Sequence, residues 1–165
     1  MVFSGSLRTP VGVLAVESDG AAIRRVHWPR AGAAVAGPEP ADPLLADALA
    51  QLQAYFAGDA TAFDLPFDLG PQSEVTRAVL VTLFDTVGHG ETVTYGELAA
   101  RSGTSVPARA IGSIMGANPI PIIVPCHRVV ASDGLGGYSG GAPGEGLVTK
   151  RWLLEHEGAL PAALF

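Results

Sequence analysis

Cys126 is the residue best suited to covalent chemistry, because it is the only cysteine among 165 residues and lies between Pro125 and His127. A thiol becomes a strong nucleophile only as the thiolate, so a reactive cysteine needs a nearby base or positive charge. His127 and Arg128 supply one of each. Cys126 and His127 alone leave two interpretations open, a reactive thiol or a structural cysteine, since most free cysteines are simply small buried hydrophobic residues.

Three prolines surround the run that leads to this cysteine. Pro119, Pro121 and Pro125 fix their φ angles and lack amide donors. We therefore expect residues 120–124 to be a buried, strand-like run, although not an ordinary central strand. Such a run would hold the cysteine rigidly at the end of an apolar wall.

The composition excludes several kinds of site and location. A single cysteine excludes an internal disulfide and a multi-cysteine zinc site, and the four histidines lack the paired spacing of metal ligands. We therefore expect no metal and no cofactor. No run is apolar enough to span a membrane and no secretory leader opens the chain, so a cytoplasmic protein without membrane contact is expected.

The charge is spread unevenly along the chain. The total is −6, but residues 92–130 carry three basic and one acidic group, whereas residues 1–91 carry five basic and eleven acidic groups. The only positive segment is thus the one that contains the cysteine. A local excess of this size predicts modest, salt-sensitive contact with DNA at most.

Residues 1–70 predict a small α/β domain with an antiparallel sheet. Alternating apolar runs joined by short turns predict three strands, at residues 2–8, 12–17 and 23–28. Asp42-Pro43 is typical of a helix start, and Gly58 ends that helix. Residues 63–69 alternate as a strand or an extended arm, and Gly70-Pro71 marks the domain boundary. This part offers no reactive cluster, so a supporting role is expected.

Residues 71–165 predict a mainly α domain with a winged-helix-like helix-turn-helix. Thr94 and Glu97 have the spacing of a capping box, which predicts a short helix that runs to Arg101. Ser105 can cap the next helix, with Pro107 in its first turn. Two short helices joined through a glycine-containing turn form a helix-turn-helix candidate, although most such pairs are plain packing units.

The second of these helices has an unusual outer face. Arg109, Gly112, Ser113 and Gly116 share that face at helical spacing, so it is nearly bare except for one arginine. Such a face lets a helix approach a partner closely, and the lone arginine could enter a base stack or a narrow groove. The alternative is helix packing through small residues with Arg109 in solvent.

A glycine-rich loop and a final helix complete the chain. Residues 133–146 lack the spacing of a phosphate-binding loop, so a mobile wall with Tyr138 and Ser139 facing a ligand is the preferred interpretation. The last helix is expected at about residues 148–157. It contains the only lysine, Lys150.

Several motifs in unbroken order resemble the O6-alkylguanine-DNA alkyltransferases. The resemblance covers about residues 90–158, and the Pro-Cys-His-Arg-Val core is specific to that family. Its elements are Tyr95, Ala108-Arg109-Ala110-Ile111-Gly112, Asn118-Pro119, Pro125-Cys126-His127-Arg128-Val129, Gly137-Tyr138-Ser139-Gly140-Gly141 and the helix from Lys150 to Gly158.

The resemblance implies a suicidal DNA repair protein. Such a protein flips a damaged guanine out of double-stranded DNA from the minor groove and moves its O6-alkyl group to its own cysteine, once per molecule. O4-alkylthymine is a second substrate class. Because the minor groove is only about 6 Å wide, a bare helix face suits it. A monomer is expected, with cooperative clustering on DNA left open.

The resemblance also implies a role for each site residue. Cys126 would be the nucleophile, His127 would deprotonate it through a water, Glu157 would orient the histidine and Asn118 would brace the turn. Tyr95 would press on the phosphate of the flipped nucleotide, and Arg109 would fill the gap that the base leaves. Val129, Tyr138 and Ser139 would line or cover the base, and DNA contacts are expected at Ala108, Ala110, Gly112, Ser113 and Arg128.

Some positions depart from the family pattern, and two other functions stay open. The departures are Thr76, Val81, His89 and about five extra residues at Ala142–Gly146, which touch packing and the pocket lid. A non-catalytic lesion-binding protein is the first alternative, although the proteins of that kind replace the cysteine. A cysteine hydrolase is the second, and it would not need an arginine on a bare helix.

Overall fold

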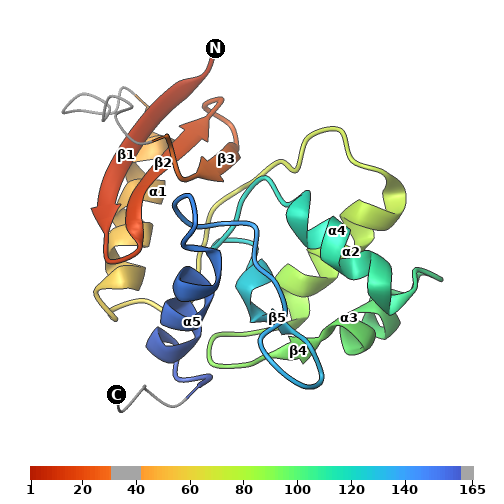
Figure 1. Ribbon diagram of the computed structural model, residues 1–165. Helices are drawn as coiled ribbons and strands as arrows, with labels where there is room; N and C mark the ends of the chain where they lie inside the picture. Colours follow the sequence, from red (N-terminus) through yellow and green to blue (C-terminus); the bar gives the residue numbers. More distant parts are fainter. Residues whose placement is uncertain (31–41, 161–165) are drawn as a thin grey trace.

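A three-stranded antiparallel sheet covered by one helix forms the N-terminal part of the chain (Figure 1). The computed structural model describes residues 1–30 and 42–160. The strands are β1 (Phe3–Thr9), β2 (Gly12–Ser18) and β3 (Ile23–His27), and the helix is α1 (Pro43–Phe56). Asp42 caps α1 by accepting a hydrogen bond from the Leu45 amide, as predicted. The buried side chains between sheet and helix are Leu14, Val16, Ile23, Val26, Leu45 and Leu52.

The segment after α1 runs alongside β3 as an extended arm. The Ile23 amide donates to Pro66 O at 2.8 Å, and the Asp68 amide donates to Ile23 O at 2.9 Å. Phe67 alone forms a bridge to the strand. Of the two predicted forms, the extended arm is therefore the one observed.

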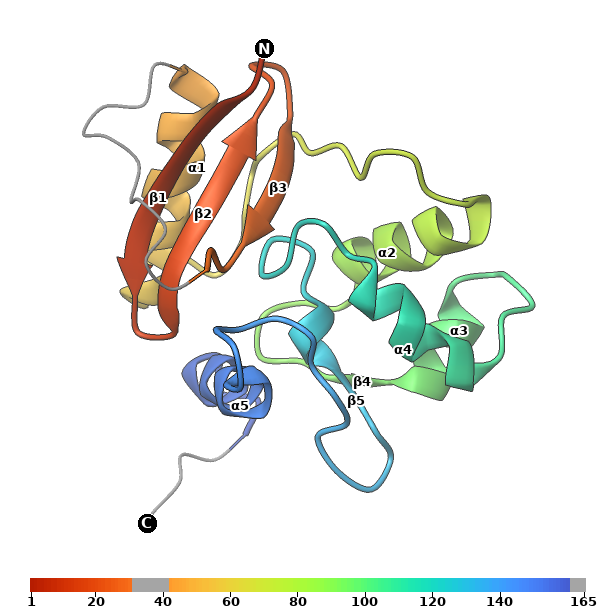
Figure 2. The same cartoon turned by 45° about the horizontal axis from the view of Figure 1, so that its top comes forward.

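Helices dominate the C-terminal part (Figure 2). They are α2 (Glu74–Thr86), α3 (Tyr95–Arg101), α4 (Ala108–Gly116) and α5 (Gly146–His156). A two-stranded parallel pair of β4 (Val93–Thr94) and β5 (Val129–Val130) was not expected from the sequence. Between α4 and β5 lies the 3-10 turn η1 (Cys126–Arg128). Residues 161–165 of the predicted second domain lie outside the described residues.

The helix-turn-helix consists of α3 and α4, which pack against each other. Thr94 and Glu97 form the predicted capping box, with hydrogen bonds of 3.1 and 3.0 Å between side chain and amide. The predicted cap of α4 is wrong. Pro107, not Ser105, is the N-cap and makes no side-chain hydrogen bond, because its extended backbone already leads directly into the helix at Ala108.

The proline-rich run before Cys126 is buried but is not strand-like, so that prediction is wrong in part. The Val124 amide donates back to Ile120 O at 2.9 Å, which closes a turn. Because Pro119 and Pro121 lack amide donors, this segment cannot form a regular ladder. Ile122 has φ of 74°, a costly conformation for a β-branched residue that the buried surroundings impose.

Hydrogen bonds on two sides tie the N-terminal part to the C-terminal part. The Val26 amide of β3 donates to Pro119 O at 3.0 Å. On the other side, His156 of α5 bonds the main-chain oxygen of Tyr55 in α1 at 2.7 Å. Among the described residues, no helix has the length and apolar character needed to cross a membrane.

Candidate active site

Cys126 begins η1 and is only 7% exposed. Its amide donates to Val124 O at 2.8 Å, which fixes the backbone that carries the thiol. Burial raises the pKa of the Cys126 thiol, while a hydrogen bond from Asn118 and the charge of Lys150 act in the opposite direction. The resting thiol is therefore protonated, and nucleophilic attack requires a base.

Asn118 holds both ends of the turn that precedes the cysteine. Its side-chain amide donates to Val124 O at 2.8 Å, and its Oδ1 accepts from the Ile120 amide at 3.0 Å. These contacts are those of a brace, which is the role that the family resemblance implied for this residue.

His127 is fully buried and faces Glu157. Its Nε2 lies 2.7 Å from Glu157 Oε2. Burial lowers the pKa of His127, and the charges of Arg128 and Lys150 lower it further. Glu157 raises the pKa, but its effect is the smaller one. A neutral imidazole beside an ionised carboxylate donates from Nε2. That tautomer leaves a lone pair on Nδ1, which is buried and has no hydrogen-bond partner among the described residues.

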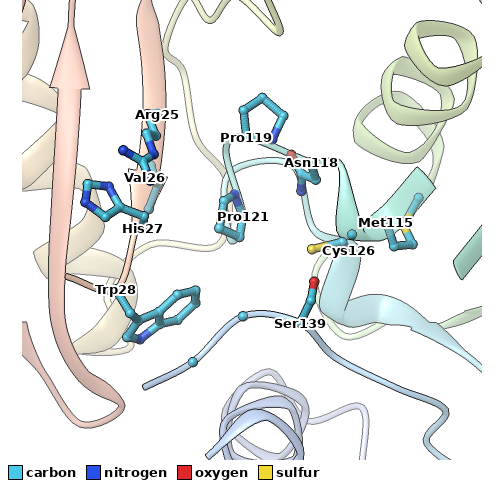
Figure 3. A pocket seen from close by; sticks show the side chains of 13 residues that line it. Arg25, Val26, His27, Trp28, Met115, Asn118, Pro119, Pro121, Cys126 and Ser139 are labelled. Carbon is cyan, nitrogen blue, oxygen red and sulfur yellow. The ribbon is translucent and has the colours of Figure 1, made fainter. Parts of the chain in front are cut away.

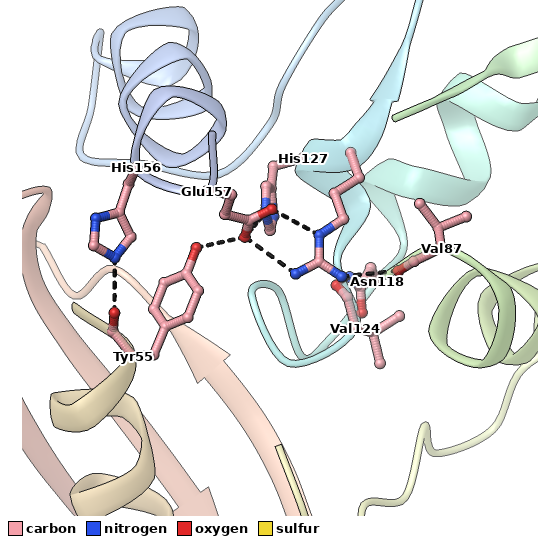
Figure 4. Close-up of polar contacts among 8 residues, drawn as sticks. Tyr55, Val87, Asn118, Val124, His127, His156 and Glu157 are labelled. Carbon is pink, nitrogen blue, oxygen red and sulfur yellow. Dashed lines mark hydrogen bonds and ion pairs between the residues drawn. The ribbon is translucent and has the colours of Figure 1, made fainter. Parts of the chain in front are cut away.

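Glu157 is the C-cap of α5 and collects three hydrogen-bond donors (Figure 4). Its Oε2 accepts from Tyr55 at 2.6 Å and from His127, and Arg128 bonds both carboxylate oxygens at 2.8 and 3.1 Å. Burial raises the pKa of Glu157, but the hydrogen bonds from His127 and Arg128 and the charge of Arg128 hold it well below its usual range. The carboxylate is thus ionised and rigidly oriented toward the histidine.

Arg128 was expected to contact DNA, and the structure contradicts that expectation. The side chain is buried, bonds Glu157 in a bidentate manner and donates to Val87 O at 2.8 Å. It points inward because the buried carboxylate needs a positive partner. Its place is in the network behind the cysteine rather than on the groove face.

Lys150 is a second buried cation whose role the sequence left unassigned. Its ammonium donates to Val129 O at 2.6 Å and to Gly137 O at 2.9 Å, so it joins the cysteine segment to the glycine-rich loop. Burial lowers the pKa of Lys150 to about 8, with the Cys126 thiolate acting in the opposite direction. Its helical spacing with Leu154 and Glu157, on the buried face of α5, was the available signal.

A cavity of about 270 Å³ opens beside the cysteine. Tyr95 and Tyr138 lie in its wall with Ser139, so three predicted substrate-binding residues meet at Cys126. The Tyr95 hydroxyl accepts from the Gly137 amide at 3.2 Å, and the buried Tyr138 hydroxyl has no partner among the described residues. The remaining lining residues are Gly112, Met115, Gly116 and Gly137.

Val129 does not occupy the predicted position in the wall. It is buried, pairs with Val93 between β4 and β5, and lines neither this cavity nor the one described next. Its carbonyl oxygen, bonded to Lys150, is its link to the site. The β4–β5 pairing turns the side chain into the core instead.

A second cavity, of about 330 Å³, lies between Cys126 and β3 (Figure 3). In this view the cysteine sulfur points toward Pro121, and the Trp28 indole lies across the cavity from it. The wall from the N-terminal part consists of Arg25, Val26, His27 and Trp28. The N-terminal part therefore contributes surface to the site, which the sequence did not indicate.

The outer face of α4 is exposed, as predicted. Arg109, Gly112, Ser113 and Gly116 are all exposed, Ala108 is exposed and Ala110 is half-buried. A groove of about 530 Å³ runs between this face and the N-terminus of α3. Tyr95 and Gly112 line both this groove and the cavity of about 270 Å³ at Cys126, so the two spaces adjoin.

The positions that depart from the family pattern are spread over the fold. Thr76 is half-buried and Val81 is exposed, both on α2, while His89 packs against Tyr55 with ring centroids 6.3 Å apart. The extra residues Ala142–Gly146 lead into the first turn of α5. None of these residues bonds the cysteine, the histidine or Glu157.

The fold and the site together define a helix-turn-helix protein that holds a buried cysteine beside a carboxylate-bound histidine. A bare helix face with one arginine borders the cavity at the cysteine.

Comparisons with known proteins identify the family. A family description of "6-O-methylguanine DNA methyltransferase, ribonuclease-like domain" matches residues 2–69, and one of "6-O-methylguanine DNA methyltransferase, DNA binding domain" matches residues 74–159. The chain therefore belongs to the 6-O-methylguanine DNA methyltransferase family.

Relatives and solved structures agree with this assignment. The methylated-DNA–protein-cysteine methyltransferase of Mus musculus is 46% identical over 128 residues, which are 74% of this chain and 59% of the mouse protein. This chain thus spans about three-fifths of that relative's length. The protein of the same description from Mycobacterium tuberculosis is 37% identical over 95% of this chain and 93% of its own.

Crystal structures extend the comparison to three dimensions. That of Mycobacterium tuberculosis O6-methylguanine methyltransferase is 37% identical, covers 99% of this chain and 98% of its own, and has a TM-score of 0.79. A crystal structure of the Mycobacterium tuberculosis protein OGT in complex with DNA, also 37% identical, covers 94% of this chain and 92% of its own, with a TM-score of 0.79. The predicted α/β N-terminal part and helical C-terminal part with a helix-turn-helix are confirmed.

Proposed function

We propose that this protein is a methylated-DNA–protein-cysteine S-methyltransferase that repairs O6-alkylguanine in double-stranded DNA. It transfers the alkyl group to its own Cys126, and O4-alkylthymine is its second substrate class. The observation that carries the proposal is the contact of His127 with Glu157, because His127 directly follows Cys126, which lines a cavity next to the bare face of α4.

The chemistry is an in-line displacement at the alkyl carbon. His127 Nδ1 takes the thiol proton, through a water, and Glu157 stabilises the imidazolium that results. The thiolate then forms the S–C bond while the C–O6 bond breaks, and guanine leaves with one proton gained at the base. The thiol thus loses one proton, guanine gains one, and a thioether is left on the protein.

The leaving base needs a hydrogen-bond donor. The Tyr95 hydroxyl accepts from the Gly137 amide, so its own proton is free to point into the cavity. We assign Tyr138 and Ser139 to the walls around the base. Because a thioether has no carbonyl for water to attack, the protein acts once.

DNA is engaged through α4 from the minor groove. Ala108, Ala110, Gly112 and Ser113 allow close approach, Arg109 fills the gap in the base stack, and Tyr95 presses on the phosphate of the flipped nucleotide. Extrusion costs a few kcal/mol, less for a damaged and poorly paired base, so it selects the lesion without sequence readout.

The setting of the reaction follows from the same chemistry. A reducing, cytoplasmic compartment keeps the thiol available. The proposed active form is a monomer, with a domain boundary near residue 70 and clustering on DNA as an additional property.

Intact mass before and after incubation with an O6-methylguanine duplex tests the proposal. The expected result is one added methyl per protein, at Cys126, and none with Cys126→Ala. Multiple turnovers, or lesion binding without a gain of mass, would overturn it; the latter would identify a non-catalytic lesion-binding protein. Burst kinetics with an ester and no response to alkylated DNA would identify a cysteine hydrolase.

A further inference from the structure

Tyr55 links the N-terminal part of the chain to the catalytic network. It lies on α1, is only 1% exposed, and its hydroxyl donates to Glu157 Oε2 at 2.6 Å across 102 positions of sequence. Nothing in the sequence motifs indicated this residue. A buried tyrosine hydroxyl usually finds a partner, and here the partner is the carboxylate that bonds the histidine.

Tyr55 and His127 bond the same carboxylate oxygen. His127 Nε2 is 2.7 Å from Oε2, so the hydroxyl and the imidazole compete for the charge of one atom. Figure 4 shows the phenol and the imidazole approaching the carboxylate from different directions. Any change at the phenol therefore alters both the direction and the basicity of the group that supports His127.

The aromatic ring is held independently of this hydrogen bond. It packs against Phe56, Phe63 and His156, with ring centroids 5.0 to 5.5 Å apart. Removal of the hydroxyl alone leaves those ring contacts in place. The structural and the chemical contributions of Tyr55 can thus be separated.

We propose that Tyr55 is a positioning residue for alkyl transfer, whose hydroxyl holds the Glu157 carboxylate against His127 and limits the basicity of that histidine. The inference rests on the proposed function. It gives the N-terminal part a role in the reaction in addition to support.

The charged and titratable groups around His127 set the direction of the expected effect. They are Glu157 and Lys150 on α5, Cys126 and Arg128 on η1, and Tyr55 on α1. His89 and His156 face the Tyr55 ring. Without the phenolic donor, Oε2 keeps more negative charge, so the imidazolium is stabilised and the pKa of His127 rises.

The first test is single-turnover methyl transfer by Tyr55→Phe, measured against pH with an O6-methylguanine duplex. We expect transfer at neutral pH to slow about tenfold, since a hydrogen bond to a charged group is lost. The midpoint of the ascending limb of the pH–rate profile should move to higher pH. Phe63→Leu, which loosens the same ring cluster without touching Glu157, should leave that midpoint unchanged.

A second variant keeps the hydrogen bond and therefore the fold. Fluorotyrosine introduced at position 55 is a stronger donor, because fluorine lowers the pKa of the phenol. The pH midpoint should then move in the opposite direction, to lower pH. A purely structural role for Tyr55 predicts no such pair of opposite shifts.

The outcomes separate this inference from the proposed function. An unchanged pH midpoint in both Tyr55 variants, with transfer by the unmodified protein intact, would overturn the positioning role alone. Absence of transfer by the unmodified protein would overturn the proposed function and the inference with it.

Discussion

At the scale of single residues, the site combines a protonated proposed nucleophile with a neutral proposed base and an ionised carboxylate. Burial favours the uncharged forms of Cys126 and His127, whereas Glu157 stays charged because Arg128 neutralises it. The cysteine is therefore unreactive until its proton has moved. Under the proposed function, this arrangement protects a thiol that is used only once.

Replacement of Glu157 tests the cost of the buried charges. Glu157→Gln leaves Arg128 buried without its counter-charge, so the free energy of unfolding should fall by about 3–5 kcal/mol. Chemical denaturation measures this free energy. Glu155→Gln, on the same helix with a long 3.7 Å pair to Arg151, is the matched control and should change it by at most about 1 kcal/mol. Equal losses in the two variants would contradict this account.

The low pKa of His127 predicts a stability that depends on pH. In the unfolded chain this histidine takes up a proton near pH 6.5, whereas the folded state resists protonation, so stability falls as pH drops below about 6.5. Between pH 7.5 and 5.5 its share is at most about 1.4 kcal/mol. The pKa of His27 is lowered too, so His27 makes stability fall with pH in the same direction. The quantity to measure is therefore the slope of unfolding free energy against pH, compared between the unmodified protein and His127→Gln. Equal slopes in the two proteins would contradict a contribution from His127.

At the scale of elements, α4 has two faces of different character. Its inner face buries Ile111, Ile114 and Met115, while the outer face is bare. Pro107 starts this helix without a side-chain cap. The helix is thus held by packing, which leaves its outer residues free for close contact with a partner.

Gly112→Ala should affect stability and DNA binding in opposite directions. A Cβ at this position meets no atom within 4 Å, and alanine is favoured over glycine in helices by about 1 kcal/mol, so the free energy of unfolding should rise. The added methyl group faces the groove, so affinity for a lesion duplex should fall. Denaturation and fluorescence-anisotropy titration measure the two effects. Unchanged affinity would argue against close approach of α4 to DNA.

Trp28, which directly follows β3, packs against the glycine-rich loop. Its indole donates to Val11 O at 3.0 Å and packs edge-on against Tyr138, and a Cβ on Gly140 would lie 2.8 Å from it. Trp28→Ala should therefore loosen the loop and slow alkyl transfer several-fold. Hydrogen exchange of residues 137–141 should rise with it. Faster transfer without faster exchange would contradict this view.

At the scale of the whole molecule, the site forms where the two parts of the chain meet. Tyr55 comes from α1, the wall of one cavity comes from β3, and the proposed nucleophile and base come from η1. The overall charge of −6 opposes DNA, so the local surface must supply the attraction.

The salt dependence of DNA binding should be weak. Arg128 is buried, so Arg101 and Arg109 are the exposed basic side chains of residues 92–130. Each phosphate contact contributes about 0.9 to the slope of log affinity against log salt, which predicts a slope no steeper than about −2 from this segment. Binding titrations between low and moderate salt give the slope. A value of about −6 would indicate a basic surface elsewhere.

Much of the local structure could be predicted because it depends on neighbouring residues. The Thr94–Glu97 capping box, the Asp42 cap and the bare face of α4 involve residues a few positions apart, so local geometry decides them. The errors at Ser105 and in the run before Cys126 arose where proline geometry competed with those local signals.

The sequence alone predicts Cys126 as the nucleophile, together with the motif around it and the helices that carry the proposed DNA contacts. The tertiary structure was needed to show that Arg128 points inward, that Val129 does not line the cavity and that Tyr55 bonds Glu157. The physical reason is that a buried charge must gather its partners from wherever the packed chain brings them. Those partners lie 29 to 102 positions from Glu157, beyond the reach of any spacing rule.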